Sequence, residues 1–431
     1  MTTSAPAIGA RRSLLRLPLA RSRLRAGGLV LADQGLISAS NFATTVIAAR
    51  GLDPSAFGVF ALAYVVLVSL IAVTFGLVTQ PHNVLGAGSK PREYRRLTST
   101  ALILQLAATG VFAVAVGAAG VIPGLADGSV VASLVVALAA WQVQDFLRRI
   151  LITEARYRAV LLSDVVSYGP QPFIFFWLWR SSELTPTTAI VAVAVTSAAG
   201  VIAGLGAAGG WLRYRIDRPV LGELLRLGRW FAGGQVLYVL SNHGYLALTA
   251  VLASTAATGS LRAALTIFGP LNVLFIAFDS VLPASYARAL QRDDEAALAL
   301  LVRETFLSTV GPVAAYCAAA ALLAGPLLSM VFGAGDDGAG AALLLLAAQA
   351  FVSYLSRILL AAVRARGQSR EVFGAYAWSV GLSLPLGAVL TFAWGATGAA
   401  LAMLAGACVV LVHTHHEYRR PPAARYARSA A

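Results

Sequence analysis

Charged residues are scarce in this chain, and their scarcity excludes most classes of protein. Only 12% of the 431 residues are charged, 58% are hydrophobic, and the mean hydropathy is +0.76. Soluble domains carry about 25% charged residues. A helix needs about 20 apolar residues to cross the hydrocarbon core of a membrane, and spans of that length fill nearly the whole chain. The sequence therefore predicts an all-α polytopic membrane protein without a soluble domain of ordinary size.

Cysteine is nearly absent, and so are the motifs of known catalysts. Cys317 and Cys408 both lie in apolar stretches, so they form no disulfide framework. The chain has no glycine-rich nucleotide loop, no Ser/His/Asp set that its loops could assemble and no motif that pairs carboxylates on one extramembrane surface for catalysis. The histidines within 413–416, beside Glu417, have the only metal-like spacing, and we interpret them as a solvated run at a membrane boundary. We expect no enzymatic activity, no cofactor and no metal.

Apolar windows bounded by charge, proline or glycine divide the chain into twelve predicted transmembrane helices. They lie near 28–50, 57–80, 98–120, 128–147, 159–180, 187–209, 230–253, 260–285, 304–325, 340–361, 372–393 and 396–413. Glycine precedes proline at Gly169-Pro170, Gly269-Pro270 and Gly311-Pro312. We expect kinks at these positions because proline removes a helical hydrogen bond.

Basic residues are concentrated on one side of the predicted spans. The two tails and every even-numbered loop hold all but three of the 33 basic residues. By the positive-inside rule these segments lie in the cytoplasm. The formal net charge of +14 therefore reflects topology, whereas basic residues that bind nucleic acid would cluster on one folded surface. We expect both termini in the cytoplasm and no nucleic-acid partner.

Residues 33–63 return in degraded form in the middle of the chain. Placing Asn41 on Asn242 also places Gly58 on Gly259, and hydropathy then continues in parallel for about six spans on each side. The other matched positions are Ser40 with Ser241 and, after one inserted residue, Pro81 with Pro283. Many secondary transporters are built from such repeats. We interpret the chain as two pseudo-symmetric six-helix lobes whose first helices face each other.

The repeat and the basic segments together predict the domain organisation. A basic cytoplasmic tail occupies 1–26 and is uncleaved and disordered, and the first lobe occupies 27–210. A cytoplasmic linker at 211–229 joins it to the second lobe at 230–413, which a basic cytoplasmic tail follows at 414–431.

Polar residues inside the spans mark a candidate substrate cavity. A charged residue at the centre of a span costs about 2.5–3.5 kcal/mol on insertion scales, so it tends to face the bundle interior or water. We predict that helices 1, 2, 7 and 8 line a central hydrophilic cavity between the lobes. Its candidate residues are Asp33, Asn41, Gln80, His82, Asp164, Gln235, Asn242, Tyr245, Arg262, Asn272 and Asp279. For the serine, threonine and asparagine residues, interhelical hydrogen bonds that only hold the bundle together are the alternative.

Three arginines lie against the general arginine bias, at the ends of spans that we place outside the cytoplasm. Arg50, Arg180 and Arg262 belong to helices 1, 5 and 8. Guanidinium groups bind phosphate well, so the three residues can form an anion path for a phosphate-bearing substrate. The alternative is that they reach outward to lipid headgroups.

Several short motifs carry a resemblance to a known family. The run SNF at 40–42, followed by ARGLDP at 49–54 and FG at 57–58, resembles the opening of bacterial polysaccharide and lipid-linked oligosaccharide flippases, the O-antigen flippase type. The basic loops REYRR at 92–96 and RYR at 156–158 are similar to cytoplasmic loops of that family. These flippases belong to the multidrug/oligosaccharidyl-lipid/polysaccharide exporter superfamily.

The resemblance implies a two-lobed alternating-access transporter in the bacterial inner membrane. Its substrate would be a polyprenyl-pyrophosphate-linked glycan or a related polysaccharide unit moved outward, and its partners would be membrane lipids and glycan-synthesis enzymes. An inside-negative potential favours outward movement of each negative charge by about 2.3 kcal/mol per 100 mV. A pyrophosphate would therefore need no coupling ion.

Three other functions fit parts of the sequence. In the sister family, Asp33 would bind a proton or sodium in exchange for a cationic drug, and the protein would be a multidrug antiporter. A membrane glycan polymerase or glycosyltransferase would share the lipid substrate, but the outside loops are too short to build such a site. A scaffold that docks glycan-synthesis enzymes would not need a duplicated polar stripe.

Overall fold

The computed structural model describes residues 17–86, 89–120, 127–208, 216–290, 295–332, 339–366 and 368–420. Within these ranges every regular element is helical. Seven helical stretches are long and apolar enough to cross a membrane. The prediction of an all-α polytopic membrane protein is confirmed.

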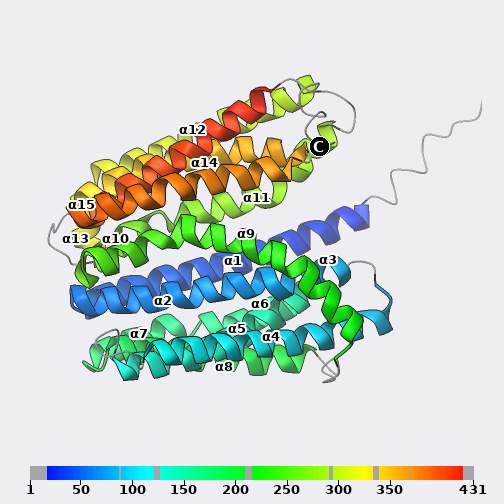
Figure 1. Cartoon of the computed structure of the whole chain (residues 1–431), viewed down its shortest axis with the longest axis horizontal. Helices are drawn as coiled ribbons and strands as arrows, with labels where there is room; N and C mark the ends of the chain where they lie inside the picture. Colours follow the sequence, from blue (N-terminus) through cyan, green and yellow to red (C-terminus); the bar gives the residue numbers. More distant parts are fainter. Residues whose placement is uncertain are drawn as a thin grey trace, which may run out of the picture.

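The helices fall into two groups. The first lobe consists of α1 (Leu17–Gly51), α2 (Pro54–Thr74), the π-helix η1 (Phe75–Thr79), α3 (Gln80–Gly86), α4 (Pro91–Ala119), α5 (Gly128–Thr153), α6 (Tyr157–Tyr168), α7 (Gln171–Arg180) and α8 (Pro186–Ala208). The second consists of α9 (Arg218–Leu252), α10 (Thr255–Ile267), α11 (Gly269–Leu290), α12 (Glu295–Leu322), α13 (Ala324–Phe332), α14 (Ala339–Ala365) and α15 (Ser369–Arg419). Figure 1 shows α1–α8 on one side and α10–α15 on the other, with α9 along the boundary.

Breaks within the spans explain why the helices outnumber the predicted crossings. One span breaks between α6 and α7 at Gly169-Pro170, and another between α10 and α11 just before Gly269-Pro270, as expected. Gly311-Pro312 instead lies within the uninterrupted α12. α15 turns sharply at Trp394 and Gly395, where Gly395 has a φ of 55° that glycine adopts readily. α2, η1 and α3 form one span, and so do α6 with α7, α10 with α11 and α12 with α13. With α15 divided at its turn, each lobe has six spans, which confirms the twelve-helix arrangement.

Matching caps start the second helix of each lobe. Asp53 Oδ1 accepts hydrogen bonds from the amides of Ser55 and Ala56 at the start of α2. At the start of α10, Ser254 Oγ accepts from the amide of Ala257. Side-chain oxygens at this position satisfy amides that the first helical turn leaves unpaired. The repeat inferred from the sequence also superimposes Asp53 on Ser254, so both copies start this helix in the same way.

The lobes meet most closely where α2 and α10 cross at two aligned glycines. A Cβ added to Gly58 would lie 1.7 Å from the carbonyl oxygen of Thr255, and one added to Gly259 would lie 2.8 Å from that of Pro54. The Ser55 and Thr255 hydroxyls are hydrogen bonded at 2.7 Å. Only glycine allows backbones to approach this closely. We call this contact the glycine seal.

The expectation that the first helices of the lobes face each other is wrong. α1 packs against α6, α7, α10 and α11, whereas α9 packs against α15, η1, α2 and α10. The first helix of each lobe thus meets the second helix of the other, and the second helices meet each other. Contact between the second helices requires small residues, and the aligned glycines of α2 and α10 supply them.

Helices extend beyond the predicted span and domain boundaries. α1 starts at Leu17, so part of the predicted tail is helical, and α15 continues to Arg419. α9 starts at Arg218, inside the predicted linker. Hydropathy detects only the stretch inside the membrane core, whereas helical hydrogen bonding continues past it. α1 starts and α15 ends at the same end of the bundle, which we call the arginine-rich end (Figure 1).

Candidate substrate site

Arg262 of α10 lies at the boundary between the lobes. Its guanidinium carbon is 5.3 Å from the ring centroid of Tyr64 in α2, within cation–π range. The Tyr64 hydroxyl donates a hydrogen bond to Asn41 Oδ1 of α1 at 3.2 Å. Among the described residues, no carboxylate lies within ion-pair distance of Arg262. The structure thus connects two of the predicted site residues, one from each lobe, through a tyrosine that the prediction did not include.

Aromatic contacts continue from Tyr64 into the first lobe. The Tyr64 and Trp141 ring centroids are 5.4 Å apart, and Trp141 Nε1 donates to the Tyr168 hydroxyl at 3.1 Å. Ser40 Oγ donates to the Tyr168 carbonyl at 2.6 Å. These contacts join α1, α2, α5 and α6, so the side of the site opposite Arg262 is held by four helices.

A buried ion cluster occupies the first lobe. Arg148 of α5 donates from Nη2 to Asp33 Oδ2 of α1 and from Nε to Asp164 Oδ2 of α6, each at 2.5 Å. Asp33 and Asp164 are almost completely buried, and Asp33 Oδ1 has no hydrogen-bond partner. Gln144 Nε2 donates to Asp164 Oδ1 at 3.3 Å. The cluster has one carboxylate more than it has cations.

The second lobe holds an ion cluster in which cations outnumber carboxylates. Asp279 of α11 accepts from Arg357 Nη1 and, at 2.9 Å, from Arg364 Nη1, both on α14. The Arg357 guanidinium also lies 4.8 Å from the Phe275 ring centroid. Here two guanidinium groups share one carboxylate. The charged interiors of the two lobes are therefore electrostatically complementary.

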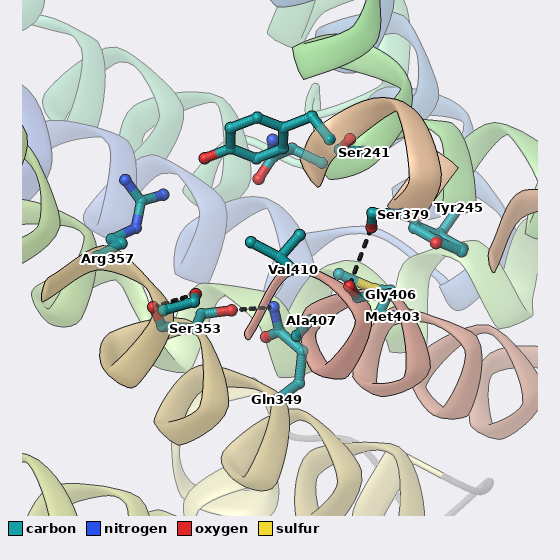
Figure 2. Close-up of a pocket in the computed structure, with 13 residues that line it drawn as sticks. Ser241, Tyr245, Gln349, Ser353, Arg357, Ser379, Met403, Gly406, Ala407 and Val410 are labelled. Atoms are coloured by element: carbon teal, nitrogen blue, oxygen red, sulfur yellow. Dashed lines mark hydrogen bonds between the residues drawn. The ribbon is translucent and has the colours of Figure 1, made fainter. Parts of the chain in front are cut away.

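A polar pocket opens within the second lobe, next to Arg357. It lies between α9, α14 and α15, and water-sized molecules can occupy about 70 Å³ of it. Serine and amide side chains line it, including Asn242, Gln349, Ser353 and Ser379, and no carboxylate is among its described lining residues. Figure 2 shows the hydrogen bonds from Gln349 to Ser353 and from Ser379 to the Gly406 carbonyl. This pocket is not the predicted cavity between helices 1, 2, 7 and 8. Of the three helices that line it, only α9, which is predicted helix 7, belongs to that set.

Buried polar atoms at this pocket leave hydrogen-bonding capacity unused. Ser241 Oγ is buried without a partner, whereas Asn242 Nδ2 donates to the Tyr238 carbonyl at 2.8 Å. The Tyr245 hydroxyl and Ser383 Oγ are hydrogen bonded at 2.5 Å. The pocket therefore presents hydroxyl, amide and guanidinium groups, which suit a ligand rich in oxygen.

The remaining predicted cavity residues differ in their burial and surroundings. His82 is fully buried inside the first lobe, where its Nε2 is 2.9 Å from Thr98 Oγ1, so it lines no open cavity there. Gln80 is half-buried at the start of α3, and Asn272 is exposed on α11. Gln235 lies against Gly76, at the contact between α9 and η1.

The three arginines of the predicted anion path occupy different settings. Arg50 and Arg180 are exposed in the last turns of α1 and α7. Arg262 is half-buried within α10. Their common path remains a prediction.

The histidine run near the C-terminus does not come together. His415 and His416 are exposed, while His413 Nε2 lies 3.8 Å from Glu371 Oε2. Ligand atoms of Glu371, His413 and Glu417 lie within 4.8 Å of one another. One of these three residues, Glu417, is already paired with Arg420 at 2.7 Å.

Three arginines that carry the two ion clusters were not among the predicted site residues. Arg148, Arg357 and Arg364 were assigned to cytoplasmic loops, but α5 continues to Thr153 and α14 to Ala365. A signal was present, because Arg357 and Arg364 are seven residues apart and so share one helical face. The one-sided arginine count placed them with the loops, because it does not show whether a side chain near a helix end points into the bundle.

Comparison with known proteins identifies the fold. No family model matches the sequence, and no curated protein sequence matches it. An inward-facing multidrug resistance MATE family transporter of the MOP superfamily superimposes with a TM-score of 0.71 at 16% identity, over 90% of this chain and 94% of the other. The lipid II flippase MurJ in an inward closed conformation gives a TM-score of 0.69 at 11% identity, over 93% and 88%.

A further match extends the same fold to a eukaryotic protein. The eukaryotic MATE transporter AtDTX14 gives a TM-score of 0.66 at 17% identity, over 94% of this chain and 98% of its own. At such low identity the likeness establishes the fold alone. The chain has the two-lobed fold that MATE transporters and MurJ share.

Proposed function

We propose that this protein carries an anionic lipid-linked oligosaccharide or polysaccharide unit from the cytoplasmic to the outer face of the bacterial inner membrane. The observation that carries this proposal is Arg262, a half-buried cation at the boundary between the lobes that has no carboxylate partner among the described residues. Burying an unpaired charge is unfavourable, and an anionic ligand removes the penalty. Arg148 and Arg357, in contrast, already contact carboxylates.

The polar groups that line the pocket of the second lobe match the hydrogen-bonding groups of a sugar. Sugar hydroxyls both donate and accept hydrogen bonds, and the serine, amide and tyrosine side chains of the pocket can do the same. The partnerless Ser241 Oγ supplies a site for such a bond. No carboxylate is among the described lining residues, so the pocket offers no negative charge to attract a cationic drug.

The arrangement of the lobes supports an inward-facing state, in which substrate enters from the cytoplasmic side. The inward-facing MATE transporter superimposes with a TM-score of 0.71, against 0.62 for an outward-facing transporter of the same description. The glycine seal lies at the end opposite to the arginine-rich end. With the arginine-rich end in the cytoplasm, the seal closes the outer side while substrate enters from the inner side.

One feature favours the second candidate function, a proton- or sodium-coupled multidrug antiporter. Arg148 shares its charge between Asp33 and Asp164, and Asp33 Oδ1 is buried without a partner. A proton on that oxygen would balance the cluster. Proton exchange at Asp33 is the step that an antiporter would need.

A reconstituted transport assay separates the two functions. Proteoliposomes are loaded with a fluorescent polyprenyl-pyrophosphate oligosaccharide or with a cationic dye, and a membrane-impermeant reagent reports movement. We expect Arg262→Gln to lower glycolipid flipping about tenfold or more, because it removes a charge-assisted contact. Arg262→Lys should retain part of the rate. Arg158→Gln, an exposed change of the same charge, should leave flipping unchanged.

Asp33→Asn supplies the opposite test in the same vesicles. The Arg148 to Asp164 pair remains intact in this variant, so glycolipid flipping should persist. Dye transport that depends on a proton or sodium gradient and is lost in Asp33→Asn, with no flipping of the glycolipid, would establish the antiporter instead.

A further inference from the structure

A groove runs along the surface of the second lobe at the arginine-rich end. α12 and the final segment of α15 both pack against α14, yet within the described part of the chain they make almost no contact with each other. The gap between them, with α14 as its floor, encloses about 1290 Å³ of empty space counting its open side. It shares no lining residue with the polar pocket of the same lobe.

The walls of the groove are almost entirely apolar. Phe306 contributes from α12, Leu359 from α14 and Val412 from α15. Val412 is 68% exposed, so the groove opens to the surroundings of the bundle. In a membrane, an apolar surface at this depth is covered by hydrocarbon chains.

The mouth of the groove is polar and basic. His415, His416 and Arg419 line it one to two turns beyond Val412, and all three are exposed. Glu417, the carboxylate nearest to them in sequence, is buried and paired with Arg420. Arg419 therefore keeps its charge available at the level where headgroups lie.

We infer that this groove binds one anionic phospholipid of the cytoplasmic leaflet. An acyl chain lies between α12 and α15 against Phe306 and Val412, and the headgroup phosphate lies against Arg419 with His415 as a further donor. Charge complementarity selects the occupant, because the cytoplasmic leaflet is rich in anionic lipids and phosphate matches a guanidinium. The bound lipid fills a gap that the protein leaves between two of its own helices. The inference does not depend on the transported substrate.

Native mass spectrometry of the purified full-length protein tests this inference. The protein in detergent is titrated with phosphatidylglycerol and, in parallel, with phosphatidylcholine of identical chains. We expect one phosphatidylglycerol to be retained in preference to phosphatidylcholine. Arg419→Gln should weaken retention of phosphatidylglycerol about fivefold, as expected for one cation near a headgroup. Arg92→Gln, an exposed change of equal charge at the same end of the first lobe, should not.

A second pair of variants tests the apolar part of the groove. Val412→Trp should fill it and abolish the preferential retention, whereas Leu162→Trp, at a 66% exposed position of the first lobe, should not. Equal retention of both lipids by the wild type would overturn the inference. Equal effects of Arg419→Gln and Arg92→Gln on retention would also overturn it. A measured mass of a dimer would overturn it as well, because a second copy of the chain would then cover the groove.

Discussion

The guanidinium of Arg148 is the only cation in contact with two buried carboxylates of the first lobe among the described residues. Asp33 and Asp164 come from different helices, so the charge of Arg148 holds α1, α5 and α6 together. In a low-dielectric interior, such groups are tolerated only when each charge has a partner. The cluster therefore has a structural role whatever the substrate is.

Loss of Arg148 should destabilise the protein strongly. Arg148→Met leaves two carboxylates buried close together, and breaking a buried pair in this way costs about 3–5 kcal/mol. Arg156→Met, which removes a more exposed partner of Glu154, should cost less than about 1 kcal/mol. Thermal unfolding in detergent measures both.

A variant that also removes the two carboxylates separates the effect of charge on stability from the effect of packing. Adding Asp33→Asn and Asp164→Asn to Arg148→Met removes the uncompensated charges and should restore much of the lost stability. Arg148→Met and Arg156→Met with equal unfolding temperatures would contradict the assigned role of Arg148.

At the residue scale, the sequence indicated which carboxylates lie inside the bundle but not which residues they contact. Asp33, Asp164 and Asp279 were selected because charge inside a span is unfavourable, and each is in an ion cluster. Their arginine partners were not selected. The positive-inside rule counts arginines near the membrane ends of helices, but it does not reveal whether a side chain points toward a loop or into the bundle.

At the scale of elements, the contact of α2 with α10 depends on the absence of side chains. A Cβ at Gly58 would overlap the carbonyl oxygen of Thr255, and the backbone cannot yield without separating the two helices. The aligned Gly259 lies on the opposite side of the same contact. The duplication thus placed one glycine in each lobe at the position where the lobes meet.

Gly58→Ala should therefore open the glycine seal. With native Cys317 and Cys408 replaced by alanine, Ser55→Cys and Thr255→Cys should form a disulfide readily, because the two hydroxyls are 2.7 Å apart. Adding Gly58→Ala should reduce the yield of this cross-link severalfold.

The matched control is Gly110→Ala in α4, where an added Cβ meets nothing within 4 Å. It should leave the cross-link unchanged and stabilise its helix by up to about 1 kcal/mol. An undiminished cross-link in Gly58→Ala would show that the lobes do not depend on this contact.

Helix identity was predictable at this scale, and helix packing was not. The break at Trp394 and Gly395 lies between two predicted spans, because glycine and a local drop in hydropathy mark it. Which helices pack across the lobe boundary depends on side-chain volume over several turns. The repeat alone therefore led to the wrong pairing of α1 with α9.

At the scale of the whole molecule, the alternation of arginine with apolar spans was sufficient to predict the fold. One missed span would have reversed the alternation from that point on, and the twelve-helix, two-lobed fold is the one that the structure shows. The polar pocket was not predictable, because its residues come from α9, α14 and α15 and meet only after packing. Substrate identity was not predictable from the fold either, because multidrug transporters and MurJ share this fold.

Dependence of glycolipid flipping on membrane potential is the measurement that tests the central claim most directly. In proteoliposomes with no ion gradient other than the one that sets the potential, the outward rate of a pyrophosphate-linked oligosaccharide is recorded as the potential is varied. An inside-negative potential favours outward movement by about 2.3 kcal/mol per charge per 100 mV, so we predict that the rate rises with the potential and that Arg262→Gln lowers it at every potential. A rate that does not change with the potential and rises only when a proton or sodium gradient is imposed would contradict the account.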